Sequence, residues 1–518
     1  METLIDLSQL DIAVIVAYFL ILGMIAWWSS FGKKNKSESL FLANKSLGWF
    51  AIGLTMWGTN VGPSMLIANA SSGFESGIVA GNFSWYAFPF IMMLAFVFAP
   101  RYLGAGVTTL PEYMGSRFGV TVQRYIAWYT ILTTLISWLG LTLFSGGIFM
   151  SQILSFPLWA CVVILVTISA LFVVSGGLKT IAYTNVFQML LLIGVSLLLV
   201  VLATNRAGGI GAVLQSTPSS YWRLFQPLDD KDFPWLAILL GYPIMGIWFW
   251  CTDQSMVQSV LGAKSLKQGQ MGANFVAWLK LIDIPLFILP GILVFILIPN
   301  LGNSTDAYLS LVKTVFPSGM IGLVVVVMIA ALISTIGSAL NSLSTVFTMD
   351  IIKRNRPEIT RPEIKKYGRL VVVAGAFLSV FLALGISRIQ GLSFFNIFQS
   401  ILGFLAPPMS VAFLFAVLWR RTSGRGVKLI LSAGTAFSLG IGVLYYTNIL
   451  FNGVHYLFVS VLIFAVLALF LFVYSLSDKK EDPAVRVLNY RPVKVTRSVG
   501  LAWSLLIIVM IMVYMLFN

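Results

Sequence analysis

Long hydrophobic segments fill most of the chain, and short polar stretches separate them. A helix needs about 20 apolar residues to cross the hydrocarbon core of a bilayer. By that rule the sequence predicts an all-α integral membrane protein with about 14 transmembrane helices, and the short connections predict a single domain over residues 1–518. The predicted spans are centred near residues 20, 60, 90, 138, 167, 192, 247, 286, 335, 377, 407, 437, 465 and 508.

The composition excludes a soluble protein. Hydrophobic residues make up 58% of the chain and charged residues 10%, with a mean hydropathy of +0.93, whereas a soluble domain is about 25% charged. Residues 11–30 follow an acidic flank, and a signal peptide needs a basic one. We therefore expect this segment to be retained as the first helix.

Lysine and arginine gather in every second connection. If both termini lie outside, the cytosolic loops hold 27 of the 33 Lys and Arg residues, as the positive-inside rule predicts. The net charge of +15 then orients the protein in a plasma (cell inner) membrane. A nucleic-acid partner is the alternative explanation, but no basic face interleaved with aromatic residues is found outside the loops.

Proline and glycine interrupt the second and seventh spans near their middle. Pro63 follows Gly58 and Gly62 in the second, and Pro243 and Gly246 lie in the seventh. Two interrupted helices five spans apart run in opposite directions, which points to an inverted repeat with a substrate site at the interruptions. Simple proline kinks with a packing role are the alternative, because both residues are common in membrane helices.

The ninth span, residues 329–350, is apolar but rich in hydroxyl groups. Small and polar side chains fall on one side at helical spacing: Ala331, Ser334, Thr335, Ser338, Asn341, Ser342 and Thr345. Such a stripe allows close packing of membrane helices. Alternatively, Ser334 and Thr335 offer two oxygens to a hard cation such as sodium, with the Ala331 carbonyl as a third.

Two charged residues lie inside the eighth span. Lys280 and Asp283 are three residues apart, so they can pair on one helix face. A charge inside the bilayer is expensive and by default marks a functional site, so both are candidate solute-binding residues, although a purely structural ion pair remains an alternative.

These segments together resemble the sodium:solute symporter family, and most of all its sodium/sugar cotransporter branch. The motifs, in order, are "SLGWFAIG" (46–53), "SGGLKTIAYTNVFQ" (175–188), "FWCTDQSMVQSVLGAKS" (249–265), "WLKL" with "LPG" (278–291), "LNSLSTVFTMDI" (340–351) and "LAPPMSVAFLFAVLWRR" (405–421). The resemblance implies a LeuT-type 5+5 fold with inverted repeats over about 48–204 and 233–447. Helix 11–30 and the helices of 453–518 would then be peripheral.

The resemblance also implies a sodium site between the second and ninth spans. Matched by position, its ligands are the carbonyls of Gly58, Val61 and Ala331 and the hydroxyls of Ser334 and Thr335. This chain has Ser-Thr where the sugar branch usually has Ser-Ser, and both offer hydroxyl oxygen. Sodium is thus the expected coupling ion.

The sugar pocket of the family carries over only in part. Asn60, Lys280 and Gln399 match its polar positions, and Trp248 and Phe249 match an aromatic pair that includes the inner gate. Three positions depart from it: Met65 replaces Gln or His, Ser84 replaces Glu, and Gly246 replaces Asn or Ser. A hexose in the usual pose would leave polar groups unpaired, at roughly 1–3 kcal/mol each, so the solute or its pose should differ.

The missing Glu at position 84 removes a negative charge while Lys280 stays. An acidic sugar or sugar acid is therefore one hypothesis, and Asp283 argues against it because it can neutralise Lys280. Asn185 stands where the family usually has an Asp linked to a second cation or to protons. An amide cannot carry that charge, so one sodium per solute and no proton-driven mode are expected.

No Walker A loop and no HExxH or GxSxG signature occurs, so neither an enzyme nor a nucleotide-driven pump is expected. The interpretation is a sodium-coupled symporter that imports a small organic solute, a sugar or sugar derivative, by alternating access. The alternatives are a sugar acid, monocarboxylate, amino acid or polyol as solute, or a sodium-independent uniporter. A receptor-like sensor is disfavoured because the longest cytosolic loops are only about twenty residues.

Overall fold

The computed structural model describes residues 8–30, 38–317, 319–387, 394–478 and 496–518. Within these ranges the regular structure is helical, and strand pairing is limited to two isolated bridges, Leu47 with Ala263 and Gln226 with Pro234. The apolar composition explains this, because helices satisfy every backbone hydrogen bond within the segment itself. The expected all-α membrane fold is confirmed.

The helices of the first half are α1 (Gln9–Ser30), α2 (Glu38–Leu42), α3 (Trp49–Asn60), α4 (Pro63–Ser76), α5 (Asn82–Trp85), α6 (Phe88–Met93), α7 (Ala99–Ala105), α8 (Leu110–Phe118), α9 (Val120–Thr133), α10 (Thr142–Leu154), α11 (Leu158–Arg206), α12 (Ile210–Ser216) and α13 (Trp235–Ile247). Short 3-10 or π segments continue several of them. Those used below are η4 (Thr134–Leu141) and η6 (Trp248–Thr252).

The second half contains α14 (Gln254–Leu261), α15 (Leu266–Asp283), α16 (Leu289–Leu297), α17 (Ala307–Val315), α18 (Ile321–Val346), α19 (Lys353–Asn355), α20 (Arg361–Ile386), α21 (Phe394–Leu418), α22 (Gly424–Leu429), α23 (Thr435–Tyr446), α24 (Tyr456–Ser477) and α25 (Arg497–Leu516). The π segment η7 (Ile284–Ile288) joins α15 to α16, and η9 (Phe347–Ile352) extends α18.

Eleven helical segments of the described ranges are long and apolar enough to cross a membrane. One of them, α11, has 49 residues and would measure about 74 Å if straight, about two and a half times the thickness of the bilayer core. Gly177 interrupts it with a left-handed φ of 58°, which fits two spans, as predicted. The described apolar part of α21 is Leu402–Leu418, slightly short of a full span. The total of 14 spans therefore stays a prediction.

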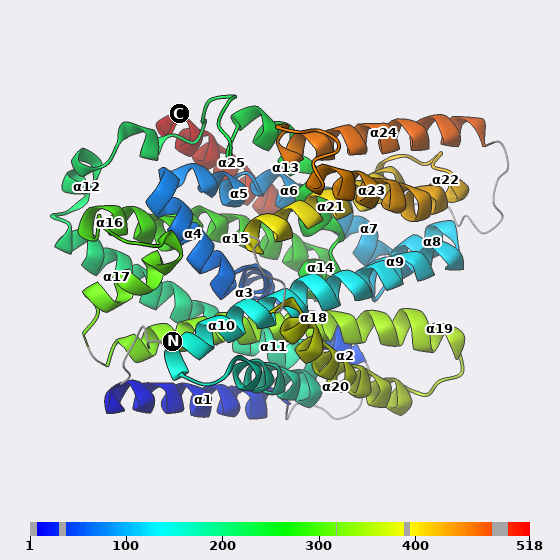
Figure 1. The fold of residues 1–518 in the computed structure, drawn as a ribbon. Coiled ribbons are helices and arrows are strands. Elements are labelled where there is room, and N and C mark those ends of the chain that lie inside the picture. Colours follow the sequence, from blue (N-terminus) through cyan, green and yellow to red (C-terminus); the bar gives the residue numbers. More distant parts are fainter. Residues whose placement is uncertain (1–7, 31–37, 318, 388–393, 479–495) are drawn as a thin grey trace.

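Helix α18 lies in the middle of the helix array. In its most apolar window 94% of residues are buried, against 22% for α1 and for α25 and 33% for α24. Figure 1 shows α1 at one edge of the array and α24 at the opposite edge, with α3, α14 and α18 between them. Because α18 carries the hydroxyl stripe, the stripe faces protein rather than lipid.

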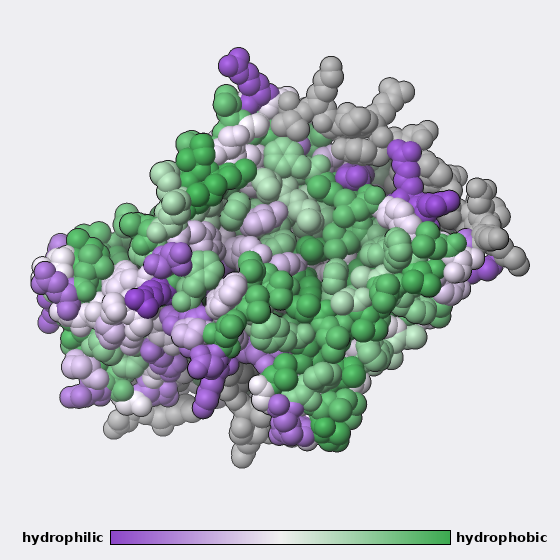
Figure 2. Space-filling view, turned by 90° about the horizontal axis from the view of Figure 1, so that it is seen from above, coloured by the Kyte–Doolittle hydropathy of each residue, from purple (hydrophilic) through white to green (hydrophobic). Residues whose placement is uncertain are grey.

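The outer helices present apolar side chains outward. Leu171, Phe377 and Leu469 are each more than 60% exposed, as expected of residues that face lipid. In Figure 2 hydrophobic side chains cover a broad area of one face, and hydrophilic ones gather toward its margins. This distribution is that of a multi-pass membrane protein.

Candidate functional site

The second predicted span is broken at its middle. Helix α3 ends at Asn60 and α4 begins at Pro63, and the intervening Val61 and Gly62 are extended, with ψ of 102° and 164°. Pro63 has no N–H to donate to the carbonyl of Thr59, four residues earlier. Backbone of this kind is tolerated at membrane depth only inside protein or beside an aqueous cavity. The break thus leaves carbonyl oxygens free for other partners.

Helix α18 meets these free carbonyl groups with two hydroxyls. Ser334 Oγ lies 3.0 Å from the Gly58 carbonyl oxygen, and Thr335 Oγ1 lies 3.5 Å from it and 3.3 Å from the Thr59 carbonyl oxygen. Both side chains are buried, and Val61 and Ala331 are fully buried as well. A set of uncharged oxygens enclosed between two helices fits the ligand preference of a hard cation.

Gly58 permits this close approach of α3 to α18. A Cβ atom built on Gly58 would lie 2.8 Å from Met189 of α11 and 3.0 Å from Ser334 Oγ. Any side chain here would therefore displace the hydroxyl or the methionine. The glycine that weakens the second span in the sequence is also a spacer between helices.

The remaining polar residues of α18 have mixed surroundings. Thr59 Oγ1 donates to Ser338 Oγ over 2.8 Å, and Gln258 of α14 donates to Thr345 Oγ1 over 2.6 Å. These bonds tie α18 to its neighbours and support a packing role. Asn341 and Ser342 are also buried, and the part of the chain that the structure describes offers their side-chain polar atoms no hydrogen-bond partner.

The seventh predicted span is interrupted later than the sequence suggested. Helix α13 continues through Pro243, and the chain leaves helical geometry only at Asp253, with ψ of 127°, after the π segment η6. Proline deprives the Leu239 carbonyl of its helical partner, and the hydroxyl of Tyr86 donates to that carbonyl over 3.2 Å. This donor compensates the lost bond, so the prediction of a break at Pro243 and Gly246 is wrong.

A buried polar network joins α3, α5 and α15 beside the first break. Lys280 Nζ donates to Asn60 Oδ1 over 2.7 Å and forms an ion pair with Asp283. Asp283 also accepts hydrogen bonds from Trp57 Nε1 and Ser84 Oγ, each over 2.9 Å. Four sequence-predicted pocket residues (Asn60, Ser84, Lys280 and Asp283) are therefore in one network, together with Trp57, which the sequence analysis did not single out.

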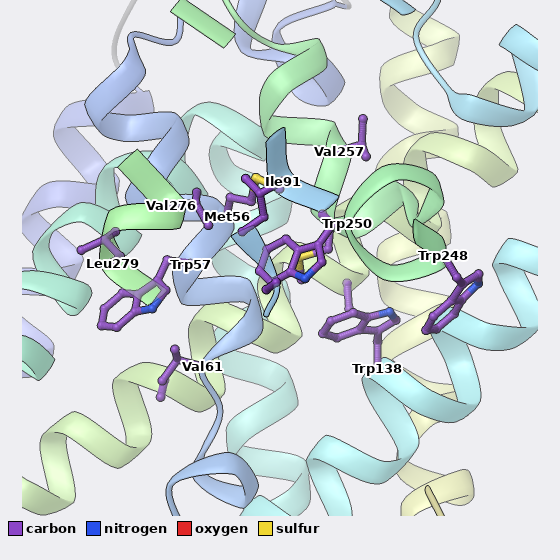
Figure 3. Close-up of a cluster of buried hydrophobic side chains, with 14 of the residues drawn as sticks. Met56, Trp57, Val61, Ile91, Trp138, Trp248, Trp250, Val257, Val276 and Leu279 are labelled. Carbon is purple, nitrogen blue, oxygen red and sulfur yellow. The ribbon is translucent and has the colours of Figure 1, made fainter. Parts of the chain in front are cut away.

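Aromatic rings adjoin this network. The Trp250 ring centroid lies 5.7 Å from Lys280 Nζ, within cation–π range. Phe249 packs against Trp250 at 5.0 Å and against Trp138 of η4 at 5.5 Å. Trp248 is buried, 6.3 Å from Phe249. In Figure 3 the rings of Trp250, Trp138 and Trp248 follow one another across the view, and Trp250 is the one nearest the α3 residues Met56 and Trp57.

Among the described side chains, the other predicted pocket residues make no hydrogen bond to the network around Lys280 and Asp283. A Cβ atom on Gly246 would lie 2.5 Å from the ring of Phe90, so that ring occupies the space a side chain would need. Met65 is partly buried in the first turns of α4. The side chain of Gln399 lies outside the described residues.

Three tryptophans adjoin the site although no individual role was predicted for them. Trp57 bonds to Asp283, Trp250 faces Lys280, and Trp138 Nε1 donates to Asp253 over 3.1 Å. Tryptophan is common in membrane proteins, so composition carries no signal. The available clue was helical spacing, because Trp57 precedes Asn60 by three residues and so lies on the same side of α3.

The chain is similar to known proteins over most of its length. The family model described as sodium:solute symporter family matches residues 40–434. Sodium/glucose cotransporter 1 of Ovis aries is 30% identical, over 96% of this chain and 81% of the relative. The sodium/mannose cotransporter of Bos taurus is also 30% identical, over 89% of this chain and 85% of the relative.

Solved structures show the same fold. A sodium-coupled sialic acid symporter, solved in a substrate-bound outward-open state, aligns with a TM-score of 0.78 at 18% identity, covering 91% of this chain and 98% of that one. The nucleobase-cation symporter Mhp1 aligns with a TM-score of 0.56 at 16% identity, covering 88% and 100%. These neighbours confirm the LeuT-type architecture.

Proposed function

Because the chain belongs to the sodium:solute symporter family, and is thus a sodium-coupled solute symporter, we propose a sodium site and a class of solute for it. The proposed sodium ligands are the carbonyl groups of Gly58, Val61 and Ala331 and the hydroxyl groups of Ser334 and Thr335. The proposed solute is a small sugar or sugar derivative that binds near the midplane.

One observation carries the sodium site. The hydroxyl groups of Ser334 and Thr335 converge on the Gly58 carbonyl at the point where α3 stops. Sodium bound here would be coordinated by the partial negative charges of these oxygens and would tie α3 to α18. Because sodium and solute would both stabilise the same arrangement of the broken helix, each would tighten the binding of the other.

The solute side rests on the network around Lys280. Asn60 and Lys280 supply hydrogen-bonding groups, Ser84 and Asp283 complete the network, and Trp248 and Phe249 supply apolar ring surface. Polar groups beside aromatic rings suit a ring-shaped, hydroxylated molecule. Met65, Gly246 and Gln399 complete the proposed pocket. The relatives' names, sodium/glucose and sodium/mannose cotransporter, support a sugar.

We propose a plasma (cell inner) membrane location with both termini outside, on the distribution of Lys and Arg. We also propose inverted repeats over about 48–204 and 233–447, with helix 11–30 and the helices of 453–518 peripheral. The breaks after Asn60 and at Asp253 support the repeat, since each interrupts a helix.

Uptake into proteoliposomes tests the function. Hexoses, polyols, sugar acids, monocarboxylates and amino acids are offered with a sodium gradient and, in parallel, a potassium gradient. We expect a sugar to accumulate under the sodium gradient and not under the potassium gradient. Equal uptake under both gradients would instead indicate a uniporter, and sodium-driven uptake confined to the non-sugar solutes would reject a sugar substrate.

A further inference from the structure

The carboxylate of Asp283 is engaged by the protein on both of its oxygens. Trp57 donates to Oδ1, while Ser84 and Lys280 donate to Oδ2. The side chain is 0% exposed. A solute in the pocket would therefore make no direct contact with the carboxylate, and the negative charge would act on it only electrostatically.

The ammonium of Lys280 is almost as buried, with the side chain 3% exposed. It carries three N–H donors, of which two are directed at Asp283 and Asn60. Among the described residues, Lys280 is the single Lys or Arg that is buried. A buried ammonium without a counter-ion would attract an anionic solute, and the adjacent carboxylate cancels that attraction.

We propose that Asp283 is the residue that sets the charge preference of the pocket. It acts through Lys280, as a positioning and neutralising group, and makes the site selective for uncharged solutes over anionic ones. This inference builds on the proposed pocket, and it decides against the sugar-acid alternative. Asn60 and the third N–H of Lys280 remain to bind a hydroxyl or carbonyl oxygen.

The contact between Ser84 and Asp283 adds a specific corollary. Ser84 Oγ lies 2.9 Å from Asp283 Oδ2, so position 84 on α5 is within reach of the same ammonium. A carboxylate placed there could neutralise Lys280 from a different helix. The preference for uncharged solutes should therefore follow the presence of one carboxylate, whichever of the two positions carries it.

The decisive experiment compares Asp283→Asn with the double variant Ser84→Glu/Asp283→Asn. Sodium-driven uptake is measured for the hexose that the wild type takes best and for the matching uronate. In Asp283→Asn the ratio of uronate to hexose uptake should rise at least tenfold. In the double variant the ratio should return to near the wild-type value.

Asp11→Asn is the matched control. Asp11 is likewise 0% exposed and accepts a backbone hydrogen bond from Gly322, but it lies outside the pocket. Its substitution should leave the ratio unchanged. If Asp283→Asn alone fails to reach the membrane, the double variant decides, because loss of the hexose preference there would overturn the proposal.

Two results separate this inference from the sugar proposal. An unchanged ratio in Asp283→Asn, with sodium-driven uptake retained, would overturn the role of Asp283 and leave sugar transport standing. A wild type that prefers an uncharged polyol to every hexose would contradict the sugar proposal. The role of Asp283 is then tested in the same variants by the ratio of uptake of the matching acid to uptake of that polyol, and an unchanged ratio in Asp283→Asn would overturn it. A wild-type preference for the uronate would overturn the inference outright.

Discussion

Ser334 and Thr335 each place a hydroxyl group against the end of α3, in the middle of the second predicted span. Their contacts to the Gly58 and Thr59 carbonyl oxygens span 3.0–3.5 Å. Such contacts could serve only to pack two helices together, or they could mark a cation site. The two roles are distinguished by how the loss of each hydroxyl changes the sodium concentration that uptake requires.

Removal of either hydroxyl should weaken sodium binding. Ser334→Ala and Thr335→Ala should each raise the sodium concentration for half-maximal uptake at least tenfold, because each removes one proposed ligand. Thr335→Ser keeps the hydroxyl and should change little. Ser344→Ala is the control, since Ser344 bonds to the Gly368 carbonyl. An equal change in the control would indicate general loosening of α18 and no specific site.

Gly58→Ala should damage the same site by crowding. The new Cβ would lie 2.8 Å from Met189 and 3.0 Å from Ser334 Oγ, and overpacking of this kind costs about 1–3 kcal/mol. We expect a lower unfolding temperature and a higher sodium requirement. Gly194→Ala, which meets no atom within 4 Å, serves as the control. Normal sodium dependence in Gly58→Ala would argue against the spacer role.

At the scale of elements, helix starts and breaks depend on which atoms satisfy the backbone. Asp253 caps α14 by accepting from the backbone N–H groups of Ser255 and Met256 over 2.8 and 3.2 Å. His455 caps α24 in the same way, with Nδ1 accepting from the N–H of Leu457 over 3.3 Å. The histidine cap works only while its imidazole is neutral, so it should respond to pH.

Burial lowers the pKa of His455, and the nearby Asp232 and Asp230 oppose that shift without reversing it. Below about pH 6.5 an unfolded histidine binds a proton that the folded one resists, so stability should fall as pH drops below that value. His455→Asn keeps a capping acceptor without titrating. The unfolding temperature of the wild type should therefore decline more steeply between pH 7 and 5 than that of this variant. Parallel curves would contradict the assignment.

At the scale of the whole molecule, coupling depends on how many sodium ions move with each solute. Asn185 lies in α11, a helix that packs against α18, and it is 1% exposed. Its amide nitrogen has no hydrogen-bond partner among the described residues. An uncharged amide offers less to a cation than a carboxylate would at the same position.

We therefore expect one sodium per solute and no proton-driven uptake. Parallel measurement of labelled sodium and labelled solute fluxes should give a ratio near one. Asn185→Asp introduces a carboxylate, and a rise in the ratio toward two would show that this position sets the number of sodium ions. A wild-type ratio of two, or uptake driven by a proton gradient alone, would refute the expectation.

Much of the molecule was determined by sequence alone, because membrane helices follow from local rules. Twenty apolar residues make a span, and Pro63 beside Gly62 stops one, since proline removes a donor from its own helix. Basic loops predict an orientation for the same local reason, and the family could be identified from ordered short motifs. The ion pair of Lys280 with Asp283 also needed only helical spacing.

Tertiary structure decided what distant residues do for one another. Pro243 was expected to break its helix, but Tyr86, far away in the chain, supplies the missing hydrogen bond. Spacing along one helix predicts the pairing of Asp283 with Lys280, but the hydrogen bonds that Trp57 and Ser84 donate to Asp283 depend on the packing of α3 and α5 beside α15. A residue's own chemistry can be read from its letter, whereas its unmet hydrogen bonds and its counter-ion depend on which helices pack beside it.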